Sequence, residues 1–310
     1  MKVGVIGAGM VGSAAAYALG MRGVASEVVL VDVDPALAAA HALDIAHAMP
    51  FASGTKITSG DYDRLRGAGV LIIAAGVAQR PGETRTDLLG RNAAVFRGVI
   101  GETMRVCPEA ILLIASNPVD IMTQIATVIS GLPPRRVIGS GTILDSARFR
   151  TLLGEHLRVS PRSIHAYVVG EHGDSQVLAW SCARAGAVPI ALFGDQVGAP
   201  ITEAVRQHID NKTRNAAYTI IKGKGSTYYG IAAGLARIVG AIRQNEEAVL
   251  TVSIAAPAVA GVQTVALSVP RVVGREGVSA DLFPHLDAGE REALYQSASK
   301  LRELFDSVTL

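Results

Sequence analysis

The sequence has few of the residues that mark secreted, metal-binding or disordered proteins. It contains 2 cysteines in 310 residues. Cys107 and Cys182 form neither a CxxC motif nor a Cys/His cluster, which argues against a disulfide framework and a metal site. Aromatic residues make up 5% and charged residues 18% of the chain, whereas hydrophobic residues make up 49%. This composition is typical of an aliphatic α/β protein, with both thiols reduced and in the core.

The sequence also lacks an excess of charge and a long apolar run. Its 29 basic and 27 acidic residues leave a net charge of +2, without the block of like charge that marks a nucleic-acid-binding arm. The weakly polar run at 249–262 is shorter than the roughly 18 apolar residues of a membrane span. The first residues enter a strand pattern directly, without a signal peptide. We therefore expect a cytoplasmic protein with no nucleic-acid or membrane partner.

Apolar runs alternate with helical segments in the first half of the chain, which predicts a parallel sheet. The runs are almost continuously aliphatic, so helices should cover both faces of the sheet in a doubly wound domain. The predicted strands are residues 2–6, 27–31, 70–74, 111–115 and 136–139.

The pattern changes after about residue 145, where strands mix with long helices. We expect a mixed α+β domain, with domains at residues 1–143 and 144–310. The final helix has a capping-box pattern, Asp287 with Glu290 three residues later. The predicted strands are residues 163–169, 250–254 and 262–269, and the predicted helices are about 200–222, 226–245 and 287–307.

A glycine motif, GAGMVG, joins the first predicted strand to the first helix. In this context its glycines give a tight turn, close approach to a pyrophosphate and close helix packing, as in a Rossmann dinucleotide-binding domain. Asp32 ends the second strand, where a carboxylate bonds ribose hydroxyls and repels a 2′-phosphate. NAD is therefore expected as cofactor, although a glycine turn beside a surface aspartate would give the same pattern. The predicted cofactor-binding residues here are Gly7, Gly9, Met10, Val11, Gly12 and Asp32.

Three later residues are candidates for catalysis. His172 lies in the motif GEHGDS, between glycines that let the backbone turn at the end of a strand. Asp145 and Arg148 are three residues apart and would share one helical face. A carboxylate can hold and polarise an imidazole, and an arginine can bind a substrate carboxylate through two parallel hydrogen bonds. Spacing alone leaves a structural histidine as the alternative.

The whole chain resembles the L-lactate dehydrogenases of the lactate/malate dehydrogenase superfamily. The resemblance implies reversible hydride transfer between C2 of L-lactate and C4 of the nicotinamide, with pyruvate as the oxidised partner. It rests on six motifs in the family's order: GAGMVG, AGVAQRPGETR, SNPVD, GSGTILDSARFR, GEHGDS and KGSTYYG.

The resemblance assigns a role to each candidate. His172 would be the acid/base for the lactate hydroxyl, with Asp145 orienting it and stabilising its charged form. Arg148 would bind the substrate carboxylate. Asn117 would help to place substrate and nicotinamide, and Thr227 would line the pocket for the substrate methyl group.

The loop that contains AGVAQRPGETR would be a lid over the substrate. Gly76 would contact the cofactor, and Arg85 would polarise the C2 carbonyl oxygen, where negative charge grows during reduction. Malate dehydrogenases carry an arginine two residues before the loop proline, where this chain has Gln79. A second substrate carboxylate would be left unpaired there, at a cost on the order of several kcal/mol. Pyruvate is therefore favoured over oxaloacetate.

Two alternative functions stay open at this point. One is a malate or other L-2-hydroxyacid dehydrogenase, which differs mainly at Gln79. The other is a non-catalytic NAD-binding sensor, which would keep the glycine turn but has no reason to retain His172, Asp145, Arg148 and Arg85 together.

A further pair of residues suggests regulation. Arg150 follows Arg148 by two residues, about 200° around a helix, so it should point away from the substrate. His165 lies in the strand that leads to His172, and either residue could be a simple surface side chain. The resemblance to bacterial lactate dehydrogenases implies that the pair binds fructose 1,6-bisphosphate across a subunit interface of a homotetramer.

Overall fold

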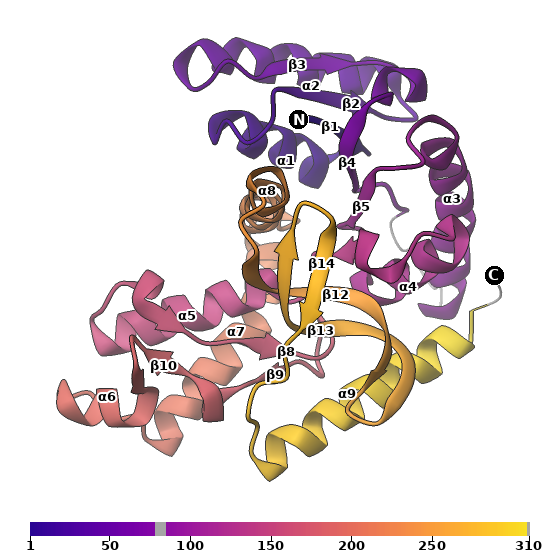
Figure 1. Cartoon of the computed structure of the whole chain (residues 1–310). Helices are drawn as coiled ribbons and strands as arrows, with labels where there is room; N and C mark the ends of the chain where they lie inside the picture. The colour runs from indigo at the N-terminus through magenta and orange to yellow at the C-terminus, as the bar shows by residue number, and fades with distance from the viewer. Residues whose placement is uncertain (78–84, 309–310) are drawn as a thin grey trace.

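A nine-stranded sheet runs through both halves of the chain in this computed structural model, which describes residues 1–77 and 85–308, without the side chains of 85–88 (Figure 1). Six of its strands are β1 (Lys2–Ile6), β2 (Glu27–Val31), β3 (Lys56–Ser59), β4 (Ala68–Ile73), β5 (Ile111–Ile114) and β6 (Val137–Gly139). They are all parallel, in the order β3-β2-β1-β4-β5-β6. This is the order of a Rossmann sheet, which confirms the predicted fold class.

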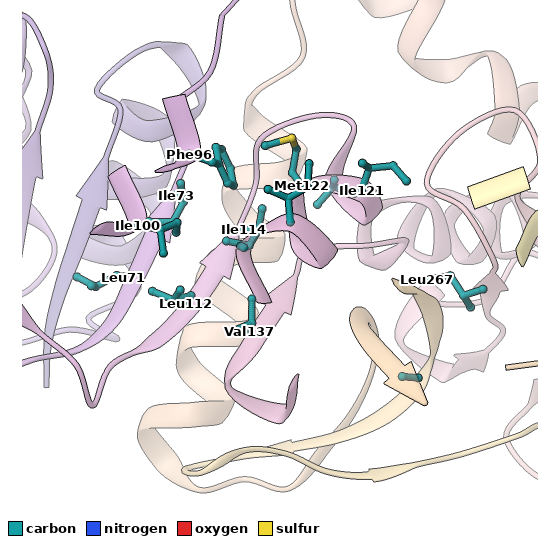
Figure 2. Packing of buried hydrophobic residues seen from close by; sticks show 14 of the residues in the cluster. Leu71, Ile73, Phe96, Ile100, Leu112, Ile114, Ile121, Met122, Val137 and Leu267 are labelled. Carbon is teal, nitrogen blue, oxygen red and sulfur yellow. The ribbon is translucent and has the colours of Figure 1, made fainter. Parts of the chain in front are cut away.

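Helices cover both faces of the parallel strands, as their continuous apolar sequences predict. On one face, Leu112 and Ile114 of β5 pack with Phe96 and Ile100 of α3 and with Met122 of α4 (Figure 2). All five side chains are fully buried, and burial of each contributes about 1.5–3 kcal/mol. The α-helices among the described residues of this half are α1 (Met10–Met21), α2 (Pro35–Ala48), α3 (Arg85–Val106) and α4 (Val119–Ser130).

Three antiparallel strands of the second half extend the same sheet. They are β12 (Ala248–Val259), β13 (Val262–Gly274) and β14 (Gly277–Asp281). β12 joins β6 through the pair Ser253 and Gly139. The sequence patterns predict β12 and β13 as shorter strands and do not indicate that they continue the parallel sheet. The boundary between residues 143 and 144 therefore stays a prediction, since the sheet crosses it.

The rest of the second half combines long helices with short strand pairs. The predicted strand at 163–169 is wrong as one strand, because β7 pairs with β10 whereas β8 pairs with β9. These elements are α5 (Ile143–Leu157), β7 (Ile164–His165), β8 (Val168–Val169), β9 (Val177–Leu178), β10 (Arg184–Ala185), β11 (Val188–Pro189), α6 (Ile190–Gln196), α7 (Glu203–Lys224), α8 (Tyr229–Gln244) and α9 (Ala288–Asp306).

The predicted capping box of the last helix is present. The Asp287 carboxylate accepts the Glu290 N–H at 2.8 Å, and the Glu290 carboxylate accepts the Asp287 N–H at 3.1 Å. These two bonds satisfy donors that the first turn of α9 would otherwise leave without a partner. None of the helices within residues 1–77 and 85–308 is long and apolar enough to cross a bilayer.

Candidate active site

A cavity of about 700 Å³ lies at the carboxyl ends of β1, β2 and β4. The strand order reverses between β1 and β4, and open α/β sheets bind ligands at such a point. Gly7, Gly9, Asp32 and Gly76 line this cavity together with Tyr62. Four of the residues predicted to bind the cofactor therefore share one cavity.

The motif glycines are needed for different reasons. Gly7 has φ +96°, a conformation that side chains rarely adopt, and a Cβ on Gly12 would lie 1.8 Å from the Gly7 carbonyl oxygen. A Cβ on Gly9 would meet no described atom within 4 Å. Gly9 is also the N-cap of α1 and makes no side-chain cap. Internal packing does not explain this glycine, whereas a pyrophosphate held at the helix N-terminus does.

The Asp32 carboxylate is fixed at the edge of the same cavity. Its Oδ2 accepts the Ala8 N–H at 2.5 Å, and its Oδ1 accepts the Asp34 N–H at 2.9 Å. Each carboxylate oxygen has a second lone pair, so the group can still accept ribose hydroxyls. The residues present thus fit NAD. Met10 and Val11 begin α1 but do not line the cavity, and their predicted contact with the cofactor stays a prediction.

The three catalytic candidates meet around one carboxylate. Asp145 Oδ2 lies 2.5 Å from Nδ1 of His172, and Asp145 Oδ1 accepts a hydrogen bond from Nη1 of Arg148 at 2.8 Å. The Asp145 side chain is 3% exposed, whereas that of His172 is 27% exposed. Asp145 lies in the first turn of α5, and His172 lies in the loop after β8.

Burial and charge act against each other in this cluster. Burial lowers the pKa of His172, but the charge and hydrogen bond of Asp145 and the charge of Asp120 raise it, and the net shift is upward. Burial raises the pKa of Asp145, and His172 and Arg148 together bring it below its usual value. The carboxylate therefore stays ionised and favours Nδ1–H of the imidazole, which leaves Nε2 to exchange a proton with a substrate.

A second buried carboxylate holds the backbone of the histidine. Asp120 lies in the first turn of α4, is 2% exposed, and its Oδ2 accepts the His172 N–H at 2.8 Å. Burial raises the pKa of Asp120 to about 6. Asp120 lies in the SNPVD motif but receives no role from the sequence patterns. The sequence feature that could indicate a role for Asp120 is its position as a single acidic residue in an otherwise largely apolar helical segment, Val119–Ser130.

Other polar side chains connect the strand ends around the cavity. Ser116 donates to the Ala75 carbonyl and so links the ends of β5 and β4. Buried Asn92 accepts the Val77 N–H at 3.0 Å, where the chain leaves β4. The sequence patterns indicate no role for either residue. Two residues predicted to bind substrate lie in connecting segments. Asn117 is exposed in the segment after β5, and Thr227 is half-buried in the segment between α7 and α8.

The predicted lid contributes Gln79 and Arg85 to the site. Gln79 lies outside the described residues. Arg85 begins α3, but its side chain also lies outside the description. Their predicted contacts with substrate stay predictions.

Arg150 and His165 occupy neighbouring positions away from the catalytic cluster. Nε of Arg150 donates to the carbonyl oxygen of Ala166 at 2.9 Å, and the guanidinium lies 5.4 Å from the centre of the Tyr167 ring. Burial lowers the pKa of Arg150. His165 is exposed on β7, directly opposite the exposed Arg184 of β10. Arg150 thus contacts the residue next to His165, and Arg184 lies opposite His165, but the binding of an anion by Arg150 and His165 stays a prediction.

Comparisons with known families and sequences agree over the full chain. The family model described as lactate/malate dehydrogenase, NAD binding domain, matches residues 1–139, and that described as lactate/malate dehydrogenase, alpha/beta C-terminal domain, matches residues 142–309. An L-lactate dehydrogenase of Allorhizobium ampelinum is 62% identical over 308 residues, 99% of each chain. One of Thermus aquaticus is 59% identical over 302 residues, 97% of each chain.

Solved structures give the same result. The minor L-lactate dehydrogenase of Enterococcus mundtii, in a ligand-bound form, superimposes with a TM-score of 0.95 at 40% identity, over 100% of this chain and 98% of that one. A lactate dehydrogenase from a deep-sea metagenome library superimposes with a TM-score of 0.96, also at 40% identity, over 99% of this chain and 98% of that one.

Proposed function

The chain belongs to the lactate/malate dehydrogenase family, and from this premise we propose that it interconverts L-lactate and pyruvate with His172 as the acid/base. Its activity is that of an NAD-dependent L-lactate dehydrogenase. The observation that carries the mechanism is the joint contact of one carboxylate, Asp145, with His172 and Arg148.

The proton is moved by His172. In lactate oxidation, neutral Nε2 accepts the hydroxyl proton, and the imidazolium that forms is stabilised by the Asp145 carboxylate at 2.5 Å. In pyruvate reduction, the same nitrogen returns the proton to the C2 oxygen. Because Asp145 is almost fully buried, little solvent weakens its attraction to the charged ring.

The substrate is held by its carboxylate. Arg148 uses Nη1 for Asp145, which leaves the other guanidinium N–H groups to bind the lactate or pyruvate carboxylate. Arg85 polarises the C2 oxygen from the lid, Asn117 helps to place the substrate and the nicotinamide, and Thr227 borders the methyl group. This fixed orientation selects the L configuration, since only one face of C2 then meets the cofactor.

The cofactor is held by the residues of the 700 Å³ cavity. When bound, NAD supplies the hydride acceptor for C2 of lactate. Gly7, Gly9 and the start of α1 would hold its pyrophosphate, and Asp32 would accept its ribose hydroxyls. Gly76 would border the nicotinamide half.

Lactate is favoured over malate because Gln79 carries no charge for a second carboxylate. The test is to mix the protein with NAD and either L-lactate or L-malate and to follow the absorbance of the reduced cofactor. We expect turnover with lactate and a value of kcat/KM at least about a hundredfold lower with malate. Preference for malate would support the hypothesis of a malate dehydrogenase. No turnover with either substrate would support a non-catalytic NAD-binding sensor.

We further propose that Arg150 and His165 bind fructose 1,6-bisphosphate in a homotetramer. Each phosphate carries roughly −1.5 to −2 charges. Cations that face one another across two subunits repel without the anion and are bridged by it, which favours the active assembly. The contact of Arg150 with the Ala166 carbonyl, next to His165, supports this pairing.

A further inference from the structure

The loop that carries His172 packs against the C-terminal helix, α9. Its first residue, Gly170, pairs with Ser268 of β13 through two backbone hydrogen bonds of 2.8 and 3.0 Å. A Cβ on Gly170 would lie 2.8 Å from Oγ of Ser297 in α9. The loop backbone therefore lies directly against α9, although over 120 residues separate them.

Ser297 is the polar member of an otherwise apolar buried face. That face consists of Leu294, Ser297, Ala298 and Leu301, and Ser297 is 0% exposed. A buried hydroxyl is costly unless it is hydrogen-bonded. Its Oγ accepts the Glu171 N–H at 2.8 Å and lies 3.0 Å from Oγ of Ser175, so it bonds both ends of the loop.

Lys300 lies one helical turn after Ser297 and bonds the same loop. Its Nζ donates to Oε2 of Glu171 at 2.9 Å. That oxygen also accepts the N–H of Ser175 at 3.1 Å and its hydroxyl at 2.5 Å. The Glu171 side chain is 14% exposed. Burial opposes the charge of Glu171, but Ser175 and Lys300 lower its pKa overall.

We propose that Ser297 and Lys300 are positioning residues that fix the direction of the His172 ring through Glu171 and Ser175. The residue after Glu171 is His172 itself, whose N–H bonds Asp120 and whose ring lies 2.5 Å from Asp145. The α9 contacts therefore act together with Asp120 to hold this part of the loop. Release of the α9 contacts lets the ring move away from Asp145. The inference rests on the proposed role of His172.

The consequence is a change in proton transfer without a change in cofactor binding. When the imidazole moves away from Asp145, it loses the attraction that raises its pKa, while burial and the charge of Arg148 still lower it and the charge of Asp120 still raises it. The pKa of His172 therefore falls. Pyruvate reduction needs the protonated ring, so its alkaline limit moves to lower pH. A displacement of about 1 Å costs as much as a hundredfold in rate.

The experiment measures kcat, KM and the pH profile of pyruvate reduction in Ser297→Ala, Lys300→Met and Lys300→Arg, with NADH affinity measured by fluorescence. We expect kcat to fall about tenfold in Ser297→Ala and about threefold in Lys300→Met. The alkaline limit should move to lower pH in both, while the NADH Kd stays unchanged. Lys300→Arg keeps the charge and should recover most of the rate.

Two variants of the same helix serve as controls. Ser299→Ala removes a hydroxyl two residues from Ser297, and Arg302→Met removes a cation that bonds Asp306 and the Thr264 carbonyl instead of the loop. Both should keep the wild-type pH profile. If Ser297→Ala and Lys300→Met lower only the melting temperature and keep kcat and the pH limit, α9 is merely structural and the inference is wrong. His172→Asn, assayed in parallel, separates this failure from a failure of the acid/base assignment.

Discussion

Nδ1 of His172 and Oδ2 of Asp145 lie 2.5 Å apart, although 27 residues separate them in the chain. The other Asp145 oxygen binds Arg148. One buried carboxylate therefore links the group proposed to move the proton with the group proposed to bind the substrate. Neutralising Asp145 should therefore disturb both proton transfer and substrate binding.

The first prediction concerns the pH dependence of the reaction. The folded pKa of His172 is raised above its ordinary value of 6.5, so the ring keeps its proton to higher pH. The kcat/KM for pyruvate should therefore be constant at low pH and fall only above pH 6.5. The kcat/KM for lactate should rise through the same pH range. Asp145→Asn removes the attraction between the carboxylate and the protonated ring, so the pH at which each kcat/KM changes should move downward. The same pH values in wild type and Asp145→Asn would contradict this account.

The second prediction concerns Asp120 and stability. Its folded pKa is about 6 against an ordinary 3.8, so its protonation stabilises the fold below pH 3.8, and this contribution is lost as pH rises through about 6. The free energy of unfolding of wild type relative to Asp120→Asn should fall by about 3 kcal/mol across that range. Urea unfolding at several pH values and one protein concentration measures it. If the difference in unfolding free energy between wild type and Asp120→Asn does not change with pH, the raised pKa of Asp120 is wrong.

Elements close together in the sequence were the most predictable. GAGMVG and Asp32 follow directly from the first two strands, and helical spacing alone places Asp145 beside Arg148. The sequence patterns do not predict β3, because its sequence KITS is short and largely polar and has one buried residue. An edge strand of this kind gives neither alternation nor a continuous apolar run.

Contacts between distant segments could not be predicted in the same way. The bond of Asp120 to the His172 backbone requires α4 and the loop after β8 to meet, which only the assembled sheet decides. The extension of the parallel sheet by β12 rests on the single pair Ser253 and Gly139, which leaves no periodic signal. In the sequence, Ser297 is simply one polar residue in a packing helix. Its role becomes apparent only from its hydrogen bond with the N–H of Glu171 in the folded chain.

The third prediction concerns substrate choice. Gln79→Arg supplies a charge for the second carboxylate of oxaloacetate and leaves an unpaired cation against the pyruvate methyl group. Preference should shift toward oxaloacetate by several powers of ten, about 4–7 kcal/mol. The ratio of kcat/KM for the two keto acids measures the shift. Gln79→Glu, which adds the opposite charge, should not favour oxaloacetate, and a variant Gln79→Arg that still prefers pyruvate would show that Gln79 does not face the variable end.

The fourth prediction concerns regulation. Fructose 1,6-bisphosphate should lower the pyruvate KM of the wild type, because the anion would bridge cations of neighbouring subunits. Arg150→Gln/His165→Gln should abolish the response, whereas exposed Arg22→Gln at the end of α1 should keep it. An unchanged wild-type KM would reject the regulation. Activation that persists in the double variant would reject the site.

The most direct test of the central claim compares wild type with His172→Asn. Turnover of pyruvate by both proteins is followed through oxidation of NADH, and NADH affinity is measured separately by fluorescence. The account predicts that kcat falls by about 10²–10⁴ while the NADH Kd stays within about twofold, because the proton donor is lost but the glycine motif and Asp32 remain. Turnover close to that of the wild type, or an equal loss of NADH binding, would contradict the assignment of His172 as the acid/base.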